Sequence, residues 1–133
     1  LLWLPFIFLC RTYSVPVRIV AAAPQPGDAI QALRSIEDGF VPPILDLDLL
    51  DARIMVSSEE AFKATKMLLD KEAIFAGISC GAVVATAMKV ARRLEKGNIV
   101  CLLADAGWKY LSTNLWTKEY SDLQEELESK LWW

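Results

Sequence analysis

The feature that most constrains the fold is the stretch Phe75–Arg93, FAGISCGAVVATAMKVARR. A short apolar run enters a turn bracketed by Gly77 and Gly81, and a helix is predicted to follow whose first three turns carry no charge. Such a helix is buried on nearly every side. Because glycine permits close backbone approaches, Ser79 and Cys80 are predicted to lie where a ligand can come near a helix start. From spacing alone, however, a turn that serves only packing explains these residues better.

Length, composition and charge set the outer limits. A chain of 133 residues is long enough for one domain with a core. A hydrophobic fraction of 54% and a mean hydropathy of +0.31 are high for a chain that covers its own surface, and indicate a large buried interface or a piece of a larger protein. The net charge of -3 and the lack of a basic run argue against nucleic acid as the partner.

The residues usual in catalytic and metal sites are sparse. No histidine is present, which removes the usual general base and the commonest metal ligand. Cys10, Cys80 and Cys101 are far apart and form no C-x-x-C pair, so neither a zinc site nor a disulfide framework is predicted. Reduced thiols in a cytoplasmic protein are the simplest interpretation. Cys80 at a helix start is a candidate nucleophile, but a weak one without a histidine nearby.

The first half of the chain predicts two short strands and a helix. Val15–Ala23 is rich in β-branched and small residues and is typical of a buried parallel strand, and Ala52–Val56 reads as a second strand. Ser57 and Glu60 form a capping box, in which each side chain satisfies one unpaired backbone N–H at a helix start. An amphipathic helix is therefore predicted over Ser57–Asp70.

The second half predicts another strand and a last helix. We expect Gly97 to cap the buried helix, and the uninterrupted apolar run Asn98–Ala104 to form a central parallel strand. That strand would deliver Asp105 to the carboxyl edge of the sheet, where open α/β sheets bind ligands. Ser121–Lys130 predicts an acidic helix. Strands alternating with helices predict an α/β fold, a parallel sheet with flanking helices.

Residues 1–14 stay apart from this pattern. The run LLWLPFIFLC is too short to span a bilayer as a helix, which needs about 20 residues. It follows no basic region and precedes no small-x-small cleavage site, so no membrane association or export is expected. We treat residues 1–14 as an unexplained apolar leader to a domain of residues 15–133; a tethered or exported protein led by this run is the alternative.

Three separated runs carry a resemblance to a known family. IEDGFVPPILD, VSSEEAFKATKMLLDKEAIFAGISCGAVVATAMKVARRL and LLADAGWKYLSTNLW resemble the C-terminal part of pyridoxal-phosphate-dependent cysteine synthases. These share a fold, fold type II, with the tryptophan synthase β chain. AIQALRSIEDGFVP, ADAGWKYLST and the Leu-Trp-aromatic tail most resemble the actinobacterial cysteine synthase B branch, which takes sulfur from a thiocarboxylated carrier protein and prefers O-phosphoserine. The resemblance spans residues 15–133 and implies a partial fold-type-II domain.

The resemblance implies a cofactor site around Ser79. Ser79 matches the serine that hydrogen-bonds the pyridine nitrogen of pyridoxal 5'-phosphate. A neutral hydroxyl leaves that nitrogen largely unprotonated, which makes the ring a weaker electron sink suited to β-elimination. Gly77, Asp105 and Ala106 match segments that line the cofactor. No residue of this chain is assigned a catalytic role, and no metal is expected.

The resemblance also implies contacts for substrate and partner. Arg34 matches the position that binds the substrate phosphate, for which a planar guanidinium is suited, although an exposed arginine on a short helix explains it equally. Leu131–Trp133 resembles a tail that folds into the active-site cleft. The amino-acid substrate is a small molecule, the intact relatives are expected to be homodimers, and a sulfur-carrier protein is the partner that the branch implies.

The chain also departs from the family. The lysine that holds the cofactor, the substrate loop and the loop that cradles the cofactor phosphate belong to the family's N-terminal half and have no counterpart here. Lys63, Lys66, Lys71 and Lys89 are predicted to be solvated on helix surfaces. We therefore expect a C-terminal fragment of a cysteine synthase, inactive alone, that makes L-cysteine from O-phosphoserine or O-acetylserine when complete. A non-catalytic module that binds an N-terminal lobe or the sulfur carrier is the alternative.

Overall fold

A two-stranded parallel sheet lies at the centre of the described structure. The computed structural model describes residues 16–28, 30, 33, 35, 41, 43 and 45–123. Strand β1 (Val20–Pro24) pairs with β2 (Ala52–Val56), and the register runs from Val20 opposite Ala52 to Pro24 opposite Val56. The prediction of β2 is confirmed. β1 begins later than predicted, and Val15 lies outside the described residues.

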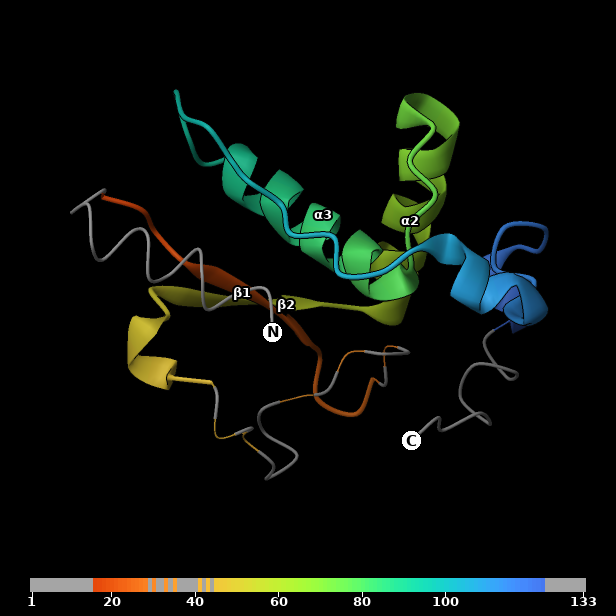
Figure 1. The fold of residues 1–133 in the computed structure, drawn as a ribbon, viewed down its shortest axis with the longest axis horizontal. Helices are drawn as coiled ribbons and strands as arrows, with labels where there is room; N and C mark the ends of the chain where they lie inside the picture. The colour runs from red at the N-terminus through yellow and green to blue at the C-terminus, as the bar shows by residue number, and fades with distance from the viewer. Residues whose placement is uncertain are drawn as a thin grey trace.

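Two helices follow the sheet. Helix α2 (Ser58–Glu72) and helix α3 (Ile78–Ala91) are joined by a short connection, and α3 packs on α2 and on both strands. Figure 1 shows α3 lying along the sheet while α2 rises away from it. Two short 3-10 helices are also present, η2 (Leu47–Leu49) and η3 (Gly107–Thr113), and residues 120–123 are helical. No helix in this part of the chain is long and apolar enough to cross a membrane.

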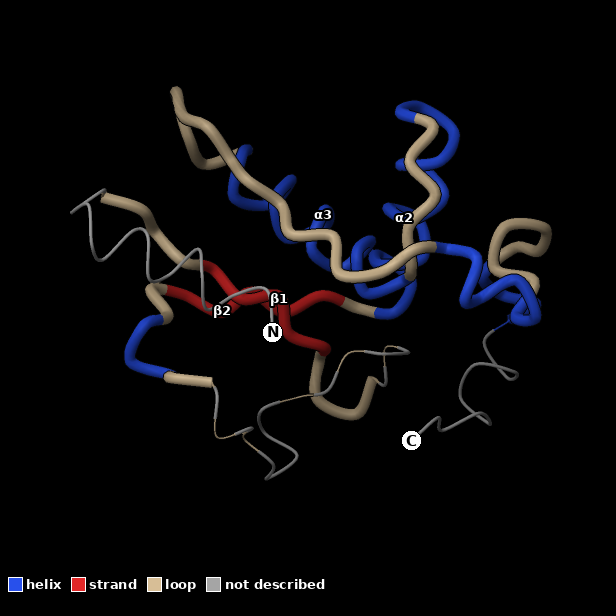
Figure 2. The backbone as a smooth tube through the Cα atoms, viewed as in Figure 1, coloured by secondary structure: helices blue, strands red, loops and turns tan. Residues whose placement is uncertain are grey.

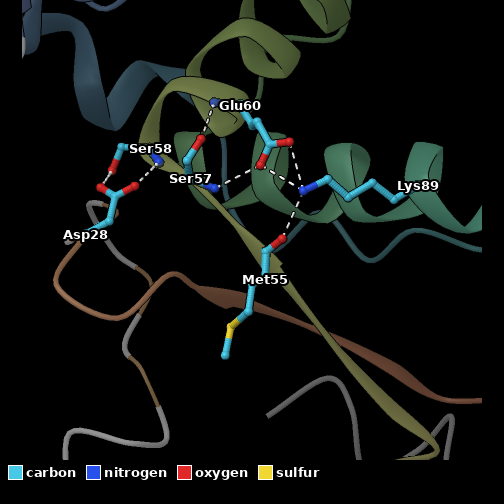
Figure 3. Close-up of polar contacts among 6 residues, drawn as sticks. All are labelled: Asp28, Met55, Ser57, Ser58, Glu60 and Lys89. Carbon is cyan, nitrogen blue, oxygen red and sulfur yellow. Dashed lines mark hydrogen bonds and ion pairs between the residues drawn. The ribbon is translucent and has the colours of Figure 1, made fainter.

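The start of α2 confirms the predicted capping box. The backbone N–H of Glu60 donates to Ser57 Oγ at 3.2 Å, and the N–H of Ser57 donates to Glu60 Oε2 at 3.0 Å. Asp28 adds a third tie, because its carboxylate accepts from the Ser58 backbone N–H at 2.7 Å and also from the Ser58 hydroxyl. Figure 3 shows these contacts around the first turn of the helix. The turn that follows β1 thereby holds the start of α2.

Two of the four lysines depart from their prediction. Lys66 pairs with Glu119 Oε1 at 3.4 Å, and its side chain is 27% exposed. Lys89 was expected to be solvated, but its Nζ donates to the carbonyl of Met55 at 2.9 Å and to Glu60 Oε2 at 2.8 Å. That prediction was wrong, because the helical register turns this ammonium toward the end of β2 and the capping carboxylate of α2. The exposed Lys63 pairs with Glu59, one turn earlier on the same helix, at 2.6 Å.

Helix α3 is buried over its first half. The buried residues of α3 are Ile78, Cys80, Gly81, Ala82, Ala85 and Thr86, whereas Met88 near its end is 38% exposed. A Cβ on Gly81 would lie 2.9 Å from the backbone nitrogen of Thr65, so this glycine lets α3 cross α2 at backbone contact. The predicted cap at Gly97 was wrong: α3 ends at Ala91, and the C-cap is Arg92 in right-handed conformation.

The strand predicted at Asn98–Ala104 is not formed. The run is irregular, and Val100 is 78% exposed. Figure 2 shows it as part of a loop that returns from the end of α3 to η3. A strand needs the backbone groups of a neighbour to satisfy its own, and no described segment pairs with this run. The next residues do pair, through an isolated antiparallel bridge between Ala76 and Ala106.

Candidate functional site

Ser79 lies in the first turn of α3 and is half-buried. The helix crosses the first turns of α2 here, where Gly81 abuts the carbonyl of Ala61, and α2 itself follows the carboxyl end of β2. The helix turn that carries Ser79 therefore lies close to the edge of the sheet at which α/β folds bind ligands. Among the described residues Ser79 Oγ has no hydrogen-bond partner, so it can donate to a ligand atom.

Gly77 is the N-cap of α3 and offers no side-chain cap. A Cβ at this position would collide with the Asp105 carboxylate and lie 2.5 Å from Cε2 of Tyr110. The backbone N–H of Gly77 donates to the carbonyl of Asp105 at 3.3 Å. The glycine thus lets residues 105–110 close onto the start of α3. Its assignment to a cofactor site stays a prediction, since its visible contacts are with the protein.

Asp105 contacts both Tyr110 and the start of α3. Its Oδ2 accepts from the Tyr110 hydroxyl at 2.5 Å, and its Oδ1 lies 3.5 Å from Cys80 Sγ. Its backbone carbonyl lies 3.4 Å from the same sulfur. A carboxylate at this place is favoured by the positive end of the helix dipole. The negative charge at the start of α3 is therefore supplied by the Asp105 side chain.

Tyr110 is the residue of this cluster that the sequence analysis missed. Burial, and then the hydrogen bond to the Asp105 carboxylate, raise the pKa of its phenol well above the ordinary value, so the hydroxyl stays protonated and donating. Within η3, Gly107 and Tyr110 are buried while Trp108 is exposed. Side chains three residues apart share a face in a 3-10 helix, so the spacing Gly-x-x-Tyr-x-x-Thr was the available signal.

Ala106 joins η3 to the turn before α3. It is half-buried and forms the bridge to Ala76, and the neighbouring N–H of Gly107 donates to the carbonyl of Phe75 at 3.0 Å. Its role beside a cofactor stays a prediction. The structure therefore brings together four of the predicted residues in one place: Ser79, Gly77, Asp105 and Ala106.

The remaining predicted residues lie elsewhere. Arg34 and Leu131–Trp133 are outside the described residues. Cys80 is fully buried, which withholds its thiol from solvent, and Cys101 is half-buried, with its pKa raised by burial. Among the residues that the structure describes, no group of three or more cysteine, aspartate or glutamate side chains is placed to hold a metal ion.

The chain matches a known protein family. The family described as "Pyridoxal-phosphate dependent enzyme" matches residues 7–105. The chain is 40% identical over 100 residues to a cysteine synthase of Buchnera aphidicola subsp. Schizaphis graminum, covering 74% of this chain and 30% of the relative. It is 32% identical over 110 residues to cysteine synthase B of Escherichia coli K12, covering 83% and 36%.

A Bacillus subtilis protein described as a probable cysteine synthase is 44% identical over 80 residues, which cover 59% of this chain and 26% of that protein. The chain thus spans between 26% and 36% of the length of these three relatives. Among solved structures, an O-ureido-L-serine synthase with O-ureido-L-serine bound is similar at a TM-score of 0.72 and 33% identity, over 92% of this chain and 41% of that one. A cysteine synthase from Entamoeba histolytica matches in fold, at a TM-score of 0.73 and 24% identity over 93% and 40%.

Proposed function

Since the chain belongs to the pyridoxal-phosphate dependent enzyme family, we propose that it is part of a cysteine synthase in which Ser79 binds the pyridine nitrogen of the cofactor. The sheet with its helices is a partial fold-type-II domain. The complete enzyme would eliminate the leaving group of an activated serine and add sulfur in its place. The observation that carries the proposal is the half-buried Ser79 hydroxyl, unpartnered among the described residues, near the carboxyl end of β2.

The residues at the start of α3 fit the ring end of the cofactor. Ser79 would keep its proton on Oγ and donate a hydrogen bond to the ring nitrogen, while the Asp105 carboxylate is engaged by Tyr110 and Cys80. A neutral donor at that nitrogen is matched to elimination at the β carbon. When bound, pyridoxal phosphate supplies the electron sink for that step. The isolated bridge between Ala76 and Ala106 would hold the backbone against the ring.

The substrate is proposed to be a serine with a leaving group on its oxygen. The related cysteine synthases and the bound O-ureido-L-serine in a similar structure, itself an O-substituted serine, support this class. The sequence motifs quoted above favour O-phosphoserine, with Arg34 on its phosphate and a sulfur-carrier protein as donor. O-acetylserine is the alternative substrate.

A non-catalytic module that associates with a separate lobe is the second candidate. The observation that favours it is the apolar run at residues 98–104, with Val100 largely exposed and no pairing strand among the described residues. Such a surface suits association with another lobe. This candidate predicts binding without cysteine formation.

A chimera tests the two candidates. Residues 15–133 would replace the matching segment of the Bacillus subtilis relative, and cysteine formation from O-acetylserine or O-phosphoserine would be measured with sulfide. We expect activity with bound cofactor, and a loss of about tenfold in S79A, the effect of one hydrogen bond to the cofactor. S121A, at an exposed serine, is the control. A folded chimera without activity would favour the second candidate, and equal activity in S79A would refute the role of Ser79.

A further inference from the structure

The start of α3 depends on groups from outside the helix. Its N-cap is Gly77, which has no side chain to accept the free N–H groups of the first turn, and that turn contains no acidic residue. Asp105, which follows Cys80 by 25 residues in the sequence, supplies both an acceptor and a negative charge to this turn. Its carbonyl accepts the Gly77 N–H and lies near the Cys80 thiol, and its carboxylate meets the positive end of the helix.

Ser79 lies between the two residues that Asp105 contacts. Gly77 precedes it by two positions and Cys80 follows it directly, so the backbone that carries the Ser79 hydroxyl is fixed on both sides by Asp105. A hydroxyl that binds a ligand atom is effective only when its direction is held. The contacts of Asp105 therefore bear on the geometry of Ser79 without any contact between the two side chains.

Tyr110 in turn holds Asp105. Its hydroxyl donates to Asp105 Oδ2 at 2.5 Å, and its buried ring lies where a Cβ of Gly77 would be. Hydrogen bonds to a carboxylate are roughly twice as strong as those between neutral groups, and burial strengthens them further. The buried face of η3 thus sets the orientation of the carboxylate, and through it the first turn of α3.

From these contacts we propose that Asp105 and Tyr110 are a positioning pair, which fixes the first turn of α3 so that the Ser79 hydroxyl is directed at the pyridine nitrogen. This inference rests on the proposed function of Ser79. In this proposal each member of the pair acts through the helix start. Because Tyr110 belongs to η3, cofactor binding would depend on η3 as well as on α3.

The first test measures the helix start without ligand. The full chain would be treated with a maleimide, and modification of Cys80 followed by peptide mass spectrometry, with Cys101 as the internal reference. Y110F keeps the ring and removes the hydroxyl, so we expect Cys80 to react about tenfold faster through local opening while Cys101 is unchanged. T113V is the matched control, because the Thr113 hydroxyl bonds within η3, to the carbonyl of Tyr110 at 2.6 Å. An unchanged Cys80 rate in Y110F would overturn the proposal.

The second test measures the ring contact. The probe is 4-deoxypyridoxine 5'-phosphate, which has the cofactor's ring but no aldehyde to react with lysines; it would be titrated into the cofactor-free chimera, which supplies the phosphate loop, and its dissociation constant read from the amide shift of residue 79 by NMR. We expect Y110F to raise the constant about tenfold, with D105N, which keeps an oxygen acceptor, between wild type and D105A. If S79A raises the constant and Y110F does not, the positioning role is wrong and the proposed function stands. If S79A also leaves the constant unchanged, or the probe does not shift the amide, both are wrong.

Discussion

The helix pair α2–α3 and the loop of residues 94–106 are both rich in apolar residues, yet only the helix pair forms the predicted structure. Helix α2 has a complete capping box, and α3 crosses it at Gly81 with backbone contact. The apolar run of the loop was predicted to be a strand, but it is irregular and Val100 is 78% exposed.

The difference lies in where the partners are. A helix satisfies its own backbone hydrogen bonds, and its apolar face here meets the next helix along the chain, so neighbouring sequence suffices. A strand depends on a neighbour that can be far away in the sequence. No described segment provides one for residues 98–104, and the run is irregular and partly exposed.

The largest expected effect tests the helix crossing. G81A would place a methyl group against the carbonyl of Ala61 and 2.9 Å from the backbone nitrogen of Thr65, neither of which can turn aside. We expect a loss of about 3 kcal/mol in the free energy of unfolding, the upper range for overpacking, measured by urea denaturation. G97A is the control in the loop, where the nearest atom would be Leu94 Cδ1 at 3.6 Å. Equal losses in the free energy of unfolding for G81A and G97A would show that the helix crossing is packed no more tightly than the loop.

A smaller effect is expected when a buried valine of the sheet and an exposed valine of the loop are each truncated to alanine. Val56, at the end of β2, is fully buried, and V56A is expected to cost about 2 kcal/mol through lost transfer energy and a cavity. V100A is expected to change stability by less than about 0.5 kcal/mol, because the side chain is mostly in water. The same denaturation experiment measures both. A comparable loss in V100A would mean that residues 98–104 are packed in solution.

The sequence was informative where the physics is local. Ser57 and Glu60 predicted the start of α2, the uncharged first turns of α3 predicted burial there, and Ala52–Val56 was correctly predicted as a strand, β2. The sequence wrongly predicted a strand at Asn98–Ala104, because strand formation depends on a distant partner. It also wrongly predicted Gly97 as the cap of α3, which ends at Ala91. Of the site, Ser79 and Asp105 were predicted through family resemblance, whereas the bond between Asp105 and Tyr110 joins η3 to α3 and needed the fold to be seen.

The smallest effect concerns the ion pair between Lys89 of α3 and Glu60 of α2. Burial raises the pKa of Glu60, but the hydrogen bond from Lys89 and those with Ser57 outweigh it and lower that pKa below its usual 4.5. A carboxylate with a lowered pKa stabilises the fold above its unfolded pKa and loses that contribution as the pH falls through the folded pKa. K89M should therefore cost about 0.5–1 kcal/mol at neutral pH, since the pair is partly exposed, and clearly less in acid, where only the bond to the Met55 carbonyl remains.

Chemical denaturation of wild type and K89M at several pH values measures this difference. K63M is the control, because the Lys63–Glu59 pair lies on the outer surface of α2 and ties no other element. A K89M deficit that persisted unchanged at low pH would show that Lys89 acts through Met55 alone and not through Glu60.

The contact between Ser79 and the ring nitrogen is tested most directly by the ¹⁵N chemical shift of that nitrogen. The chimera would be loaded with ¹⁵N-labelled pyridoxal phosphate, and its spectrum compared with that of S79A. A donated hydrogen bond from Ser79 predicts a shift typical of a hydrogen-bonded, unprotonated pyridine that moves toward the unbonded value in S79A. An identical shift in both proteins would contradict the assignment of Ser79.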